Sequence, residues 1–177
     1  DAVRKSVQAS APTVEKQIKG VNSETGLMAK DQSLAPHLAH EGVLRVAEAF
    51  LGDHFKVSFT TAIINNPGNE RGGWHADWPF NQRNGGSIKA PYHDAVTHLT
   101  TIWMLSPFSA ETGGTLIVPG SHRSNTNPTT DMGVDPMAHY PTEMQATGDP
   151  GSVLFFDGRL WHATATNRGD KPRVGVA

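Results

Sequence analysis

Residues 151–176 read GSVLFFDGRLWHATATNRGDKPRVGV and contain three short runs of apolar and β-branched residues separated by turn residues. The first run, 152–156, ends at an Asp-Gly pair, which is a turn signal. The second and third runs, 161–166 and 173–177, flank a short polar loop, and this spacing is typical of a β-hairpin. The stretch therefore predicts three consecutive strands, the last two paired with each other.

Similar runs precede this stretch along the chain. Residues 56–64, 96–105 and 114–119 are rich in β-branched and aromatic residues and end at Gly, Pro or Asn. Residues 36–51 instead carry their apolar side chains at helical spacing, between a proline and a glycine. Helices first and then roughly seven short strands predict a mainly β chain with flanking helices, whose core is a sandwich or a barrel.

The composition agrees with this expectation and excludes several function classes. Gly (18) and Pro (12) are abundant among the 177 residues, which favours short strands joined by turns. A net charge of −2 without a block of like charges argues against a nucleic-acid or membrane surface. The absence of cysteine excludes disulfides, thiolate metal sites and cysteine nucleophiles. No apolar run has the length of a membrane span and no signal peptide is visible, so we expect a cytoplasmic protein, of undetermined oligomeric state.

His75 and Asp77 lie two residues apart within GGWHADWPF, residues 72–80. If this segment is extended, both polar side chains project to one face and the tryptophans to the other. An H-x-D pair alone is weak evidence, because short polar pairs are common on strands. His162 at the start of a later strand would complete a set of two histidines and one carboxylate, which is typical of non-haem Fe(II) oxygenases. His98 and the other histidines show no spacing that links them to this set.

A dicarboxylate that chelates such a metal would need a cation at its far end. Arg173 follows His162 by eleven residues, and a guanidinium can bind a carboxylate through two parallel hydrogen bonds. Thr164 shares the face of His162 and could add a hydroxyl donor. Two alternatives remain: Arg173 could pair with Asp170 or Asp157 on the surface, and the threonine could be present for its strand propensity alone.

Three further residues are candidates for the wall of a substrate or co-substrate pocket. Trp78 opens a long loop, 79–94, and could cover the substrate, although packing in the core is the default for a large aromatic residue. Thr101 and Trp103 lie on one face of a predicted strand and would reach the pocket if that face looks inward. Together with a second long loop, 122–142, the first loop would contact the substrate.

The H-x-D pair, the stretch GGTLIVPGSHR at 113–123 and the stretch 151–176 together resemble the phytanoyl-CoA dioxygenase family, whose members are Fe(II)- and 2-oxoglutarate-dependent oxygenases. The resemblance covers roughly residues 55–177. It implies a double-stranded β-helix, also called a jelly roll or cupin-like barrel, with helices on one side. We therefore expect a single domain over 1–177, with a helical part over about 1–52 and a jelly-roll core over about 53–177.

The resemblance also implies roles for the candidate residues. His75, Asp77 and His162 would bind Fe(II). Arg173, helped by Thr164, would hold the C5 carboxylate of 2-oxoglutarate, while its C1 carboxylate and keto oxygen chelate the iron. Reaction with O2 would then yield succinate and CO2 and hydroxylate a small organic substrate. Because halogenating relatives replace the carboxylate ligand by a small residue, Asp77 favours hydroxylation.

Two other functions remain compatible with the sequence. A cupin-type metalloenzyme that does not use 2-oxoglutarate would share the barrel and the ligands but would not need Arg173. A non-catalytic relative would merely bind a ligand. Relatives in the family usually continue beyond the position of Ala177 and have a strand before the first helix, so the resemblance also implies a chain truncated at both ends.

Overall fold

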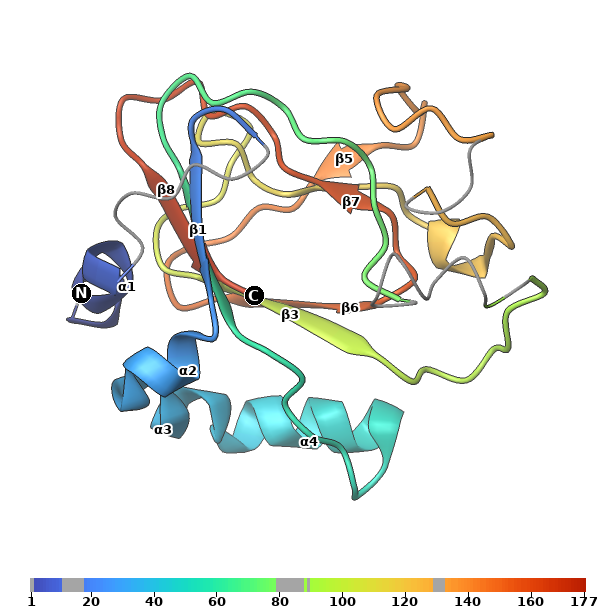
Figure 1. Cartoon of the computed structure of the whole chain (residues 1–177), viewed down its shortest axis with the longest axis horizontal. Helices are drawn as coiled ribbons and strands as arrows, with labels where there is room; N and C mark the ends of the chain where they lie inside the picture. Colours follow the sequence, from blue (N-terminus) through green and yellow to red (C-terminus); the bar gives the residue numbers. More distant parts are fainter. Residues whose placement is uncertain (1, 11–17, 79–87, 89, 129–132) are drawn as a thin grey trace.

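Two antiparallel sheets form the core of the protein (Figure 1). The structure is a computed structural model that describes residues 2–10, 18–78, 88, 90–128 and 133–177. The larger sheet has the order β1-β2-β8-β3-β6 and consists of β1 (Val21–Thr25), β2 (Thr61–Asn65), β8 (Arg173–Val176), β3 (Leu99–Met104) and β6 (Val153–Asp157). The smaller sheet has the order β5-β4-β7 and consists of β5 (Met144–Gln145), β4 (Leu116–Ile117) and β7 (His162–Ala163).

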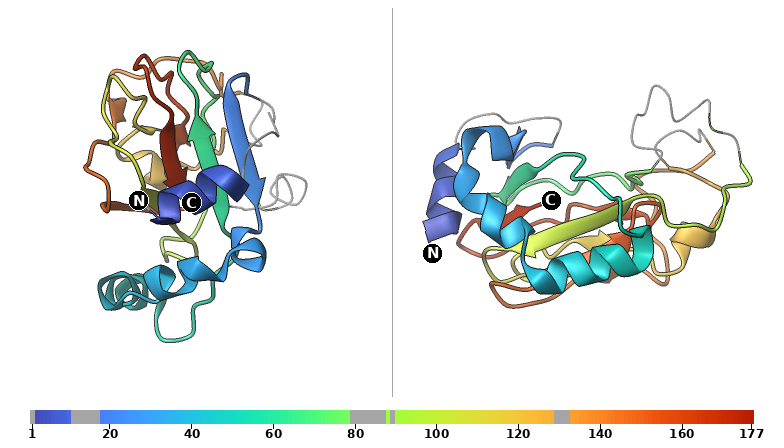
Figure 2. Two further views of the ribbon diagram at one scale, coloured as in Figure 1. Left: turned by 90° about the vertical axis from the view of Figure 1, so that its left-hand side faces the viewer. Right: turned by 90° about the horizontal axis from the view of Figure 1, so that it is seen from below.

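The helices lie outside this sandwich, on the side of the larger sheet (Figure 2). They are α1 (Ala2–Ser10), α2 (Leu27–Lys30), η1 (Gln32–Leu34), α3 (Ala35–Leu38) and α4 (Glu41–Leu51), while the short η2 (Ser121–Arg123) follows β4. The helix predicted over 36–51 is interrupted between α3 and α4. The interruption occurs because His40 is extended and its ring accepts a hydrogen bond from the amide of Gly42, which caps the start of α4.

Strand alternation divides the larger sheet into a helix-facing side and an inner side. Val174 and Val176 of β8 belong to a core cluster that the first helices cover. Because successive side chains alternate, Arg173 and Gly175 point to the inner side. The helix-covered cluster comprises Val7, Leu27, Leu34, Ala62, Ile64, Val174 and Val176, and the inner cluster comprises Ile102, Met104, Phe108, Phe156 and Leu160.

The predicted hairpin between 161–166 and 173–177 is wrong. β7 pairs with β4 in the smaller sheet, whereas β8 pairs with β2 and β3 in the larger one. The connecting loop crosses between the sheets, because the buried side chain of Asn167 donates to the carbonyls of Asn65 and Lys171 and folds the loop against β2. His162 and Arg173 therefore belong to opposite sheets of the sandwich.

Among the described segments, no helix combines the length and the apolar character that a membrane span requires.

Candidate metal centre

Two reciprocal backbone hydrogen bonds bring His75 and His162 together. The amide of each residue donates to the carbonyl of the other, at 3.0 and 2.9 Å, in an isolated antiparallel bridge. Residues directly opposite each other in an antiparallel pair project to the same face, and the two imidazole centroids are 4.1 Å apart. The H-x-D segment thus borders β7 through one bridge and does not form a regular strand.

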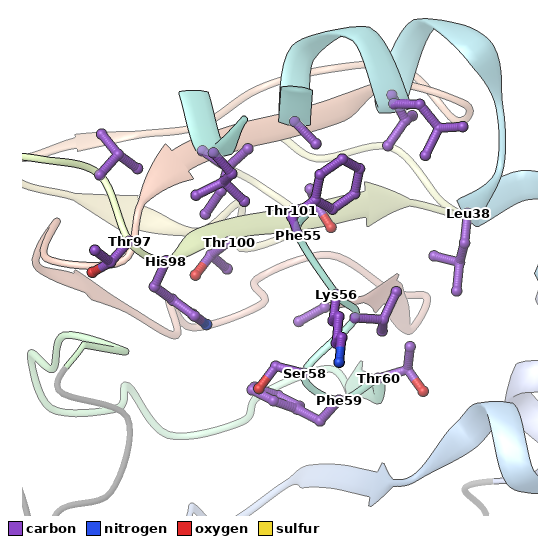
Figure 3. A pocket seen from close by; sticks show the side chains of 18 of the residues that line it. Leu38, Phe55, Lys56, Ser58, Phe59, Thr60, Thr97, His98, Thr100 and Thr101 are labelled. Carbon is purple, nitrogen blue, oxygen red and sulfur yellow. The ribbon is translucent and has the colours of Figure 1, made fainter. Parts of the chain in front are cut away.

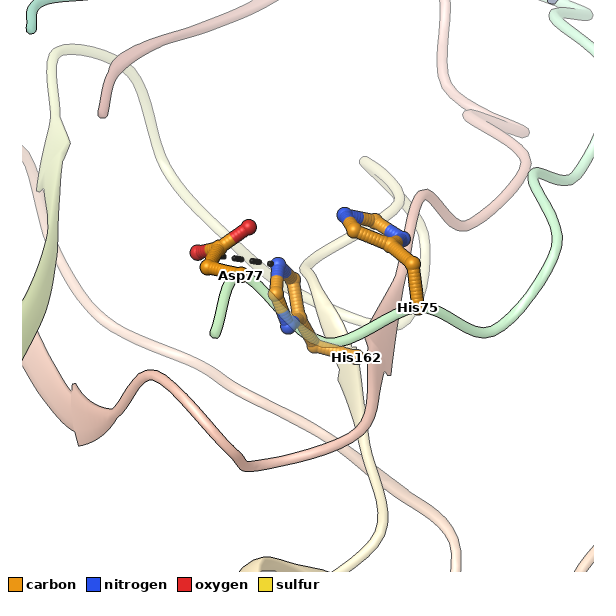
Figure 4. Close-up of side chains that lie close together, drawn as sticks. All are labelled: His75, Asp77 and His162. Carbon is orange, nitrogen blue, oxygen red and sulfur yellow. Dashed lines mark ion pairs between the residues drawn. The ribbon is translucent and has the colours of Figure 1, made fainter. Parts of the chain in front are cut away.

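Asp77 completes a cluster of three side chains that could hold a metal ion (Figure 4). One ligand atom of each residue lies within 4.8 Å of the other two, and Oδ2 of Asp77 is 3.6 Å from Nε2 of His162. The amides of Asp77 and Trp78 both donate to the carbonyl of Gly158. A Cβ at Gly158 would lie 2.3 Å from Nδ1 of His98, so a larger residue at this position would collide with the His98 ring.

Backbone carbonyls set the tautomer of both histidines. Nδ1 of His75 is 3.2 Å from the carbonyl of Gly73, and Nδ1 of His162 is 2.9 Å from the carbonyl of Leu160. A carbonyl accepts but cannot donate, so both Nδ1 atoms carry the proton and both Nε2 atoms keep a lone pair. This is the arrangement in which histidines ligate metals, with the second ring nitrogen hydrogen-bonded to the protein.

Thr100 of β3 orients the carboxylate, and the sequence did not single it out. Its hydroxyl donates to Oδ2 of Asp77 at 2.7 Å. Thr100 and Thr101 are successive residues of β3, so their side chains project to opposite faces of the strand. A correct choice of the inner face would therefore have identified Thr100. Phe156 was missed as well, and its ring centroid is 4.7 Å from that of His162.

The surroundings favour the protonation states that a metal requires. Burial of the imidazole, together with the neighbouring His162, lowers the pKa of His75 to about 4. Burial opposes ionisation of Asp77, but the nearby His162 and His75 and the hydrogen bond from Thr100 hold the pKa of its carboxyl below the usual value. At neutral pH this imidazole is therefore neutral and this carboxylate is charged.

The lowered pKa of His75 predicts an acid-sensitive apoprotein. Protonation of this residue is easier in the unfolded chain than in the folded one, so its contribution to stability is complete above pH 6.5 and is lost as the pH falls toward 4. We expect the free energy of unfolding of the metal-free protein, measured by urea denaturation, to fall by about 2–3 kcal/mol over this range. The variant His75→Asn should show a smaller fall; an equal fall would contradict the prediction.

Arg173 is buried on the inner face of β8 and has no carboxylate partner among the described residues. Its side chain is only 3% exposed, its guanidinium lies 4.4 Å from the ring centroid of Phe108, and burial lowers its pKa to about 10. Asp157, one proposed surface partner, instead pairs with Arg159 at 2.6 Å. The surface salt-bridge alternative is therefore wrong for Asp157, and the side chain of Arg173 is not on the surface at all.

Thr164 lies just beyond the end of β7, two residues after His162. Its carbonyl accepts a hydrogen bond of 2.9 Å from the amide of Gly72, which extends the contact between β7 and the H-x-D segment. The residue is half-buried. Its role as a hydroxyl donor stays a prediction.

Thr101 and Trp103 lie on the other face of β3, away from the metal-ligand cluster. Thr100 and Met104 are buried on the inner face, and the residues that alternate with them face the helices. Thr101 and Trp103 both border a cavity of about 560 Å³ between α4 and the larger sheet (Figure 3). The sequence left the orientation of this face open, because it could not show where α4 packs. In the structure the face is turned toward α4, so the condition under which Thr101 and Trp103 would reach the metal-site pocket is not met.

Trp78 belongs to an aromatic cluster directly after Asp77. Its ring makes edge contacts with Tyr92 and His93, with centroids 5.4 Å apart in both cases. Arg159 ties this region to the end of β6, because its guanidinium donates to the carbonyls of His93 and Asp94. Much of the first predicted substrate loop, 79–87 and 89, and residues 129–132 of the second lie outside the described residues.

Comparison with known proteins decides the family. The sequence profile of the phytanoyl-CoA dioxygenase (PhyH) family matches residues 2–175. The chain belongs to this family. A curated relative, the dioxygenase af480 of Aspergillus fumigatus, is 31% identical over 131 residues, which cover 73% of this chain and 38% of that protein.

An uncharacterised protein of Mycobacterium tuberculosis is 25% identical over 139 residues, covering 78% of this chain and 43% of that protein. The chain thus spans less than half the length of these two curated relatives.

Several solved structures share the fold. HygX from Streptomyces hygroscopicus, with nickel, 2-oxoglutarate and hygromycin B bound, has a TM-score of 0.71 at 17% identity, covering 99% of this chain and 74% of that one. EctD from S. alaskensis with bound Fe has a TM-score of 0.75 at 22% identity, covering 99% of this chain and 65% of that one. The expected double-stranded β-helix is confirmed.

Proposed function

We propose that this chain is the catalytic core of a non-haem Fe(II)- and 2-oxoglutarate-dependent dioxygenase that hydroxylates a small organic substrate. The observation that carries the proposal is the convergence of two imidazoles and one carboxylate within 4.8 Å, opposite a sheet that bears a buried guanidinium. Membership of the PhyH family supports it. The proposal includes a single domain over 1–177 and a cytoplasmic location.

The donor set fits Fe(II) better than a structural zinc ion. Each of His75, Asp77 and His162 offers one ligand atom, and two histidines with one carboxylate leave open positions on the metal for a chelating co-substrate and O2. A structural zinc site would be closed by four protein ligands, and the cluster in the described part of the chain has three.

Arg173 fits the distal carboxylate of 2-oxoglutarate. A buried guanidinium is costly without an anionic partner, and its Nε has no hydrogen-bond partner among the described residues. Arg173 would bind the C5 carboxylate, with Thr164 as an additional donor, and would thereby orient the co-substrate toward the three metal ligands. Bound iron supplies the oxidising chemistry, in which 2-oxoglutarate and O2 yield succinate and CO2 and one oxygen atom enters a C–H bond of the substrate.

The similar structures support a small-molecule substrate. HygX was solved with hygromycin B and EctD with 5-hydroxyectoine. In this chain the cluster of Trp78, Tyr92 and His93 follows directly on Asp77, and we assign it to the substrate wall. With the carboxylate ligand in place, hydroxylation is the proposed outcome.

Succinate formation tests the proposal. We expect the protein, reconstituted with Fe(II), to convert 2-oxoglutarate to succinate in air even without its substrate, by slow uncoupled turnover, and to form none under argon. Binding of Fe(II) without any succinate would favour a cupin-type enzyme that does not use 2-oxoglutarate. A protein that binds 2-oxoglutarate anaerobically but never forms succinate would instead be a non-catalytic ligand-binding relative.

A further inference from the structure

Asn65 is the direct cross-strand partner of Arg173. The register of β2 and β8 pairs these two residues, and opposite residues of an antiparallel pair project to the same face. Their neighbours Ile64 and Val174 are in the cluster that the helices cover. The side chains of Asn65 and Arg173 therefore lie next to each other on the inner side of the larger sheet.

Within the part of the chain that the structure describes, each of the two side chains has one buried polar atom without a hydrogen-bond partner. Nε of Arg173 is a donor without an acceptor, and Oδ1 of Asn65 is an acceptor without a donor. Both residues are buried, with exposed fractions of 3% and 0%. A buried polar group that makes no hydrogen bond is costly, and these two atoms are chemically complementary, because an Nε–H donates and an amide oxygen accepts.

The rest of Asn65 is fixed in place. Its Nδ2 is 3.3 Å from the carbonyl of Ala165, which decides the orientation of the amide and turns Oδ1 the other way. Its own carbonyl accepts a hydrogen bond of 3.0 Å from Nδ2 of Asn167. Ala165 follows the ligand His162 by three residues. Asn65 thus joins the segment that bears a metal ligand to the strand that bears Arg173.

Asn65 could decide which edge of the Arg173 guanidinium faces a ligand. The Phe108 ring packs against the guanidinium from one side, and Nη1 passes within 3.6 Å of the position that a Cβ of Gly175 would occupy. Within the plane of the guanidinium, either of two edges of the group could bind a carboxylate. A hydrogen bond from Nε selects the edge formed by Nη1 and Nη2.

We propose that Asn65 is a positioning residue for the co-substrate site: its Oδ1 accepts from the Nε–H of Arg173 and turns the Nη1/Nη2 edge toward the distal carboxylate of 2-oxoglutarate. This inference rests on the proposed function, because it needs 2-oxoglutarate as the ligand. Asn65 itself does not touch the co-substrate. It acts by fixing the orientation of Arg173 and its spacing from the His162 segment.

The variant Asn65→Leu tests this proposal by direct binding. With Mn(II) as a redox-inert metal, we expect 2-oxoglutarate to bind about tenfold more weakly in titration calorimetry, because a hydrogen bond to a charged group is lost. Affinity for Mn(II) alone should be unchanged. Asn66→Ala is the matched control, since the Asn66 side chain bonds to Gly20 and Asn22 near β1, and its 2-oxoglutarate affinity should equal that of the wild type.

A double-mutant cycle separates positioning from a general structural role. Lysine at position 173 has no Nε–H, so in the Arg173→Lys background the additional change Asn65→Leu should leave 2-oxoglutarate affinity unchanged. An equal loss in both backgrounds would overturn the proposal, as would unchanged affinity in the single variant. Should Asn65→Leu fail to fold, Asn65→Ala removes the same oxygen and takes its place in the cycle.

The wild-type protein provides an independent measurement. In the Zn(II) and 2-oxoglutarate complex, we expect the Arg173 Nε–H to give a resolved NMR signal that exchanges slowly with water. Rapid exchange of this proton in the complex would exclude the hydrogen bond. If the wild type binds a metal but no 2-oxoglutarate, the proposed function fails as well. If the wild type binds 2-oxoglutarate and Asn65→Leu does not weaken that binding, only the positioning role is overturned.

Discussion

Replacing His162 by alanine is expected to abolish tight metal binding and succinate formation together. His162 is the member of the cluster that touches both of the others, with its ring 4.1 Å from that of His75 and its Nε2 3.6 Å from Asp77. Loss of a residue that merely orients a metal ligand already costs about 10–100-fold in affinity. We therefore expect loss of the ligand itself to weaken Mn(II) binding by more than about 100-fold.

The measurement is anaerobic titration with Mn(II), followed by addition of Fe(II) and 2-oxoglutarate. The wild type should develop a weak visible charge-transfer band, and His75→Ala, Asp77→Ala and His162→Ala should not. His139→Ala is the matched control, because His139 is exposed and pairs with Glu143 on the surface. A band that survives in any of the three variants would remove that residue from the proposed ligand set.

The proximity of His75 and Asp77 could be predicted from the two-residue period of extended chains. The two-residue spacing predicted that His75 and Asp77 share a face, and the structure places their ligand atoms together. Periodicity gives relative orientation only. It could not say which face of β3 looks inward, because that depends on where α4 packs. Thr101 was therefore named as a candidate, while the structure places Thr100 beside Asp77.

The long-range part of the site depends on contacts that the sequence does not display. Hairpin spacing suggested that His162 and Arg173 lie on paired strands, but their strands belong to different sheets. The difference arises from Asn167, which is fully buried and folds the connecting loop against Asn65. In the sequence, Asn65 begins the run Asn-Asn-Pro-Gly and reads as part of a turn. Only the register of β2 and β8 reveals it as a neighbour of Arg173.

Replacing Arg173 by methionine is expected to weaken 2-oxoglutarate binding by about 3 kcal/mol, or roughly 100-fold. Metal affinity in the absence of 2-oxoglutarate should not change, because the guanidinium is on the opposite sheet from His162. The apoprotein should become more stable. Burial of this charge is unfavourable when no carboxylate of the described residues pairs with it, and a methionine side chain can fill the same space against Phe108.

Opposite effects on binding and on stability distinguish a ligand-binding charge from a structural one. Arg159→Met is the matched control: Arg159 pairs with Asp157 at 2.6 Å, so its loss leaves a half-buried carboxylate unpaired and should lower the free energy of unfolding. The two variants are compared by urea denaturation of the metal-free proteins and by calorimetry with Mn(II) and 2-oxoglutarate.

Unchanged 2-oxoglutarate affinity in Arg173→Met would exclude Arg173 from the co-substrate site. A loss of stability in that variant would show that the guanidinium already has a compensating partner in the apoprotein.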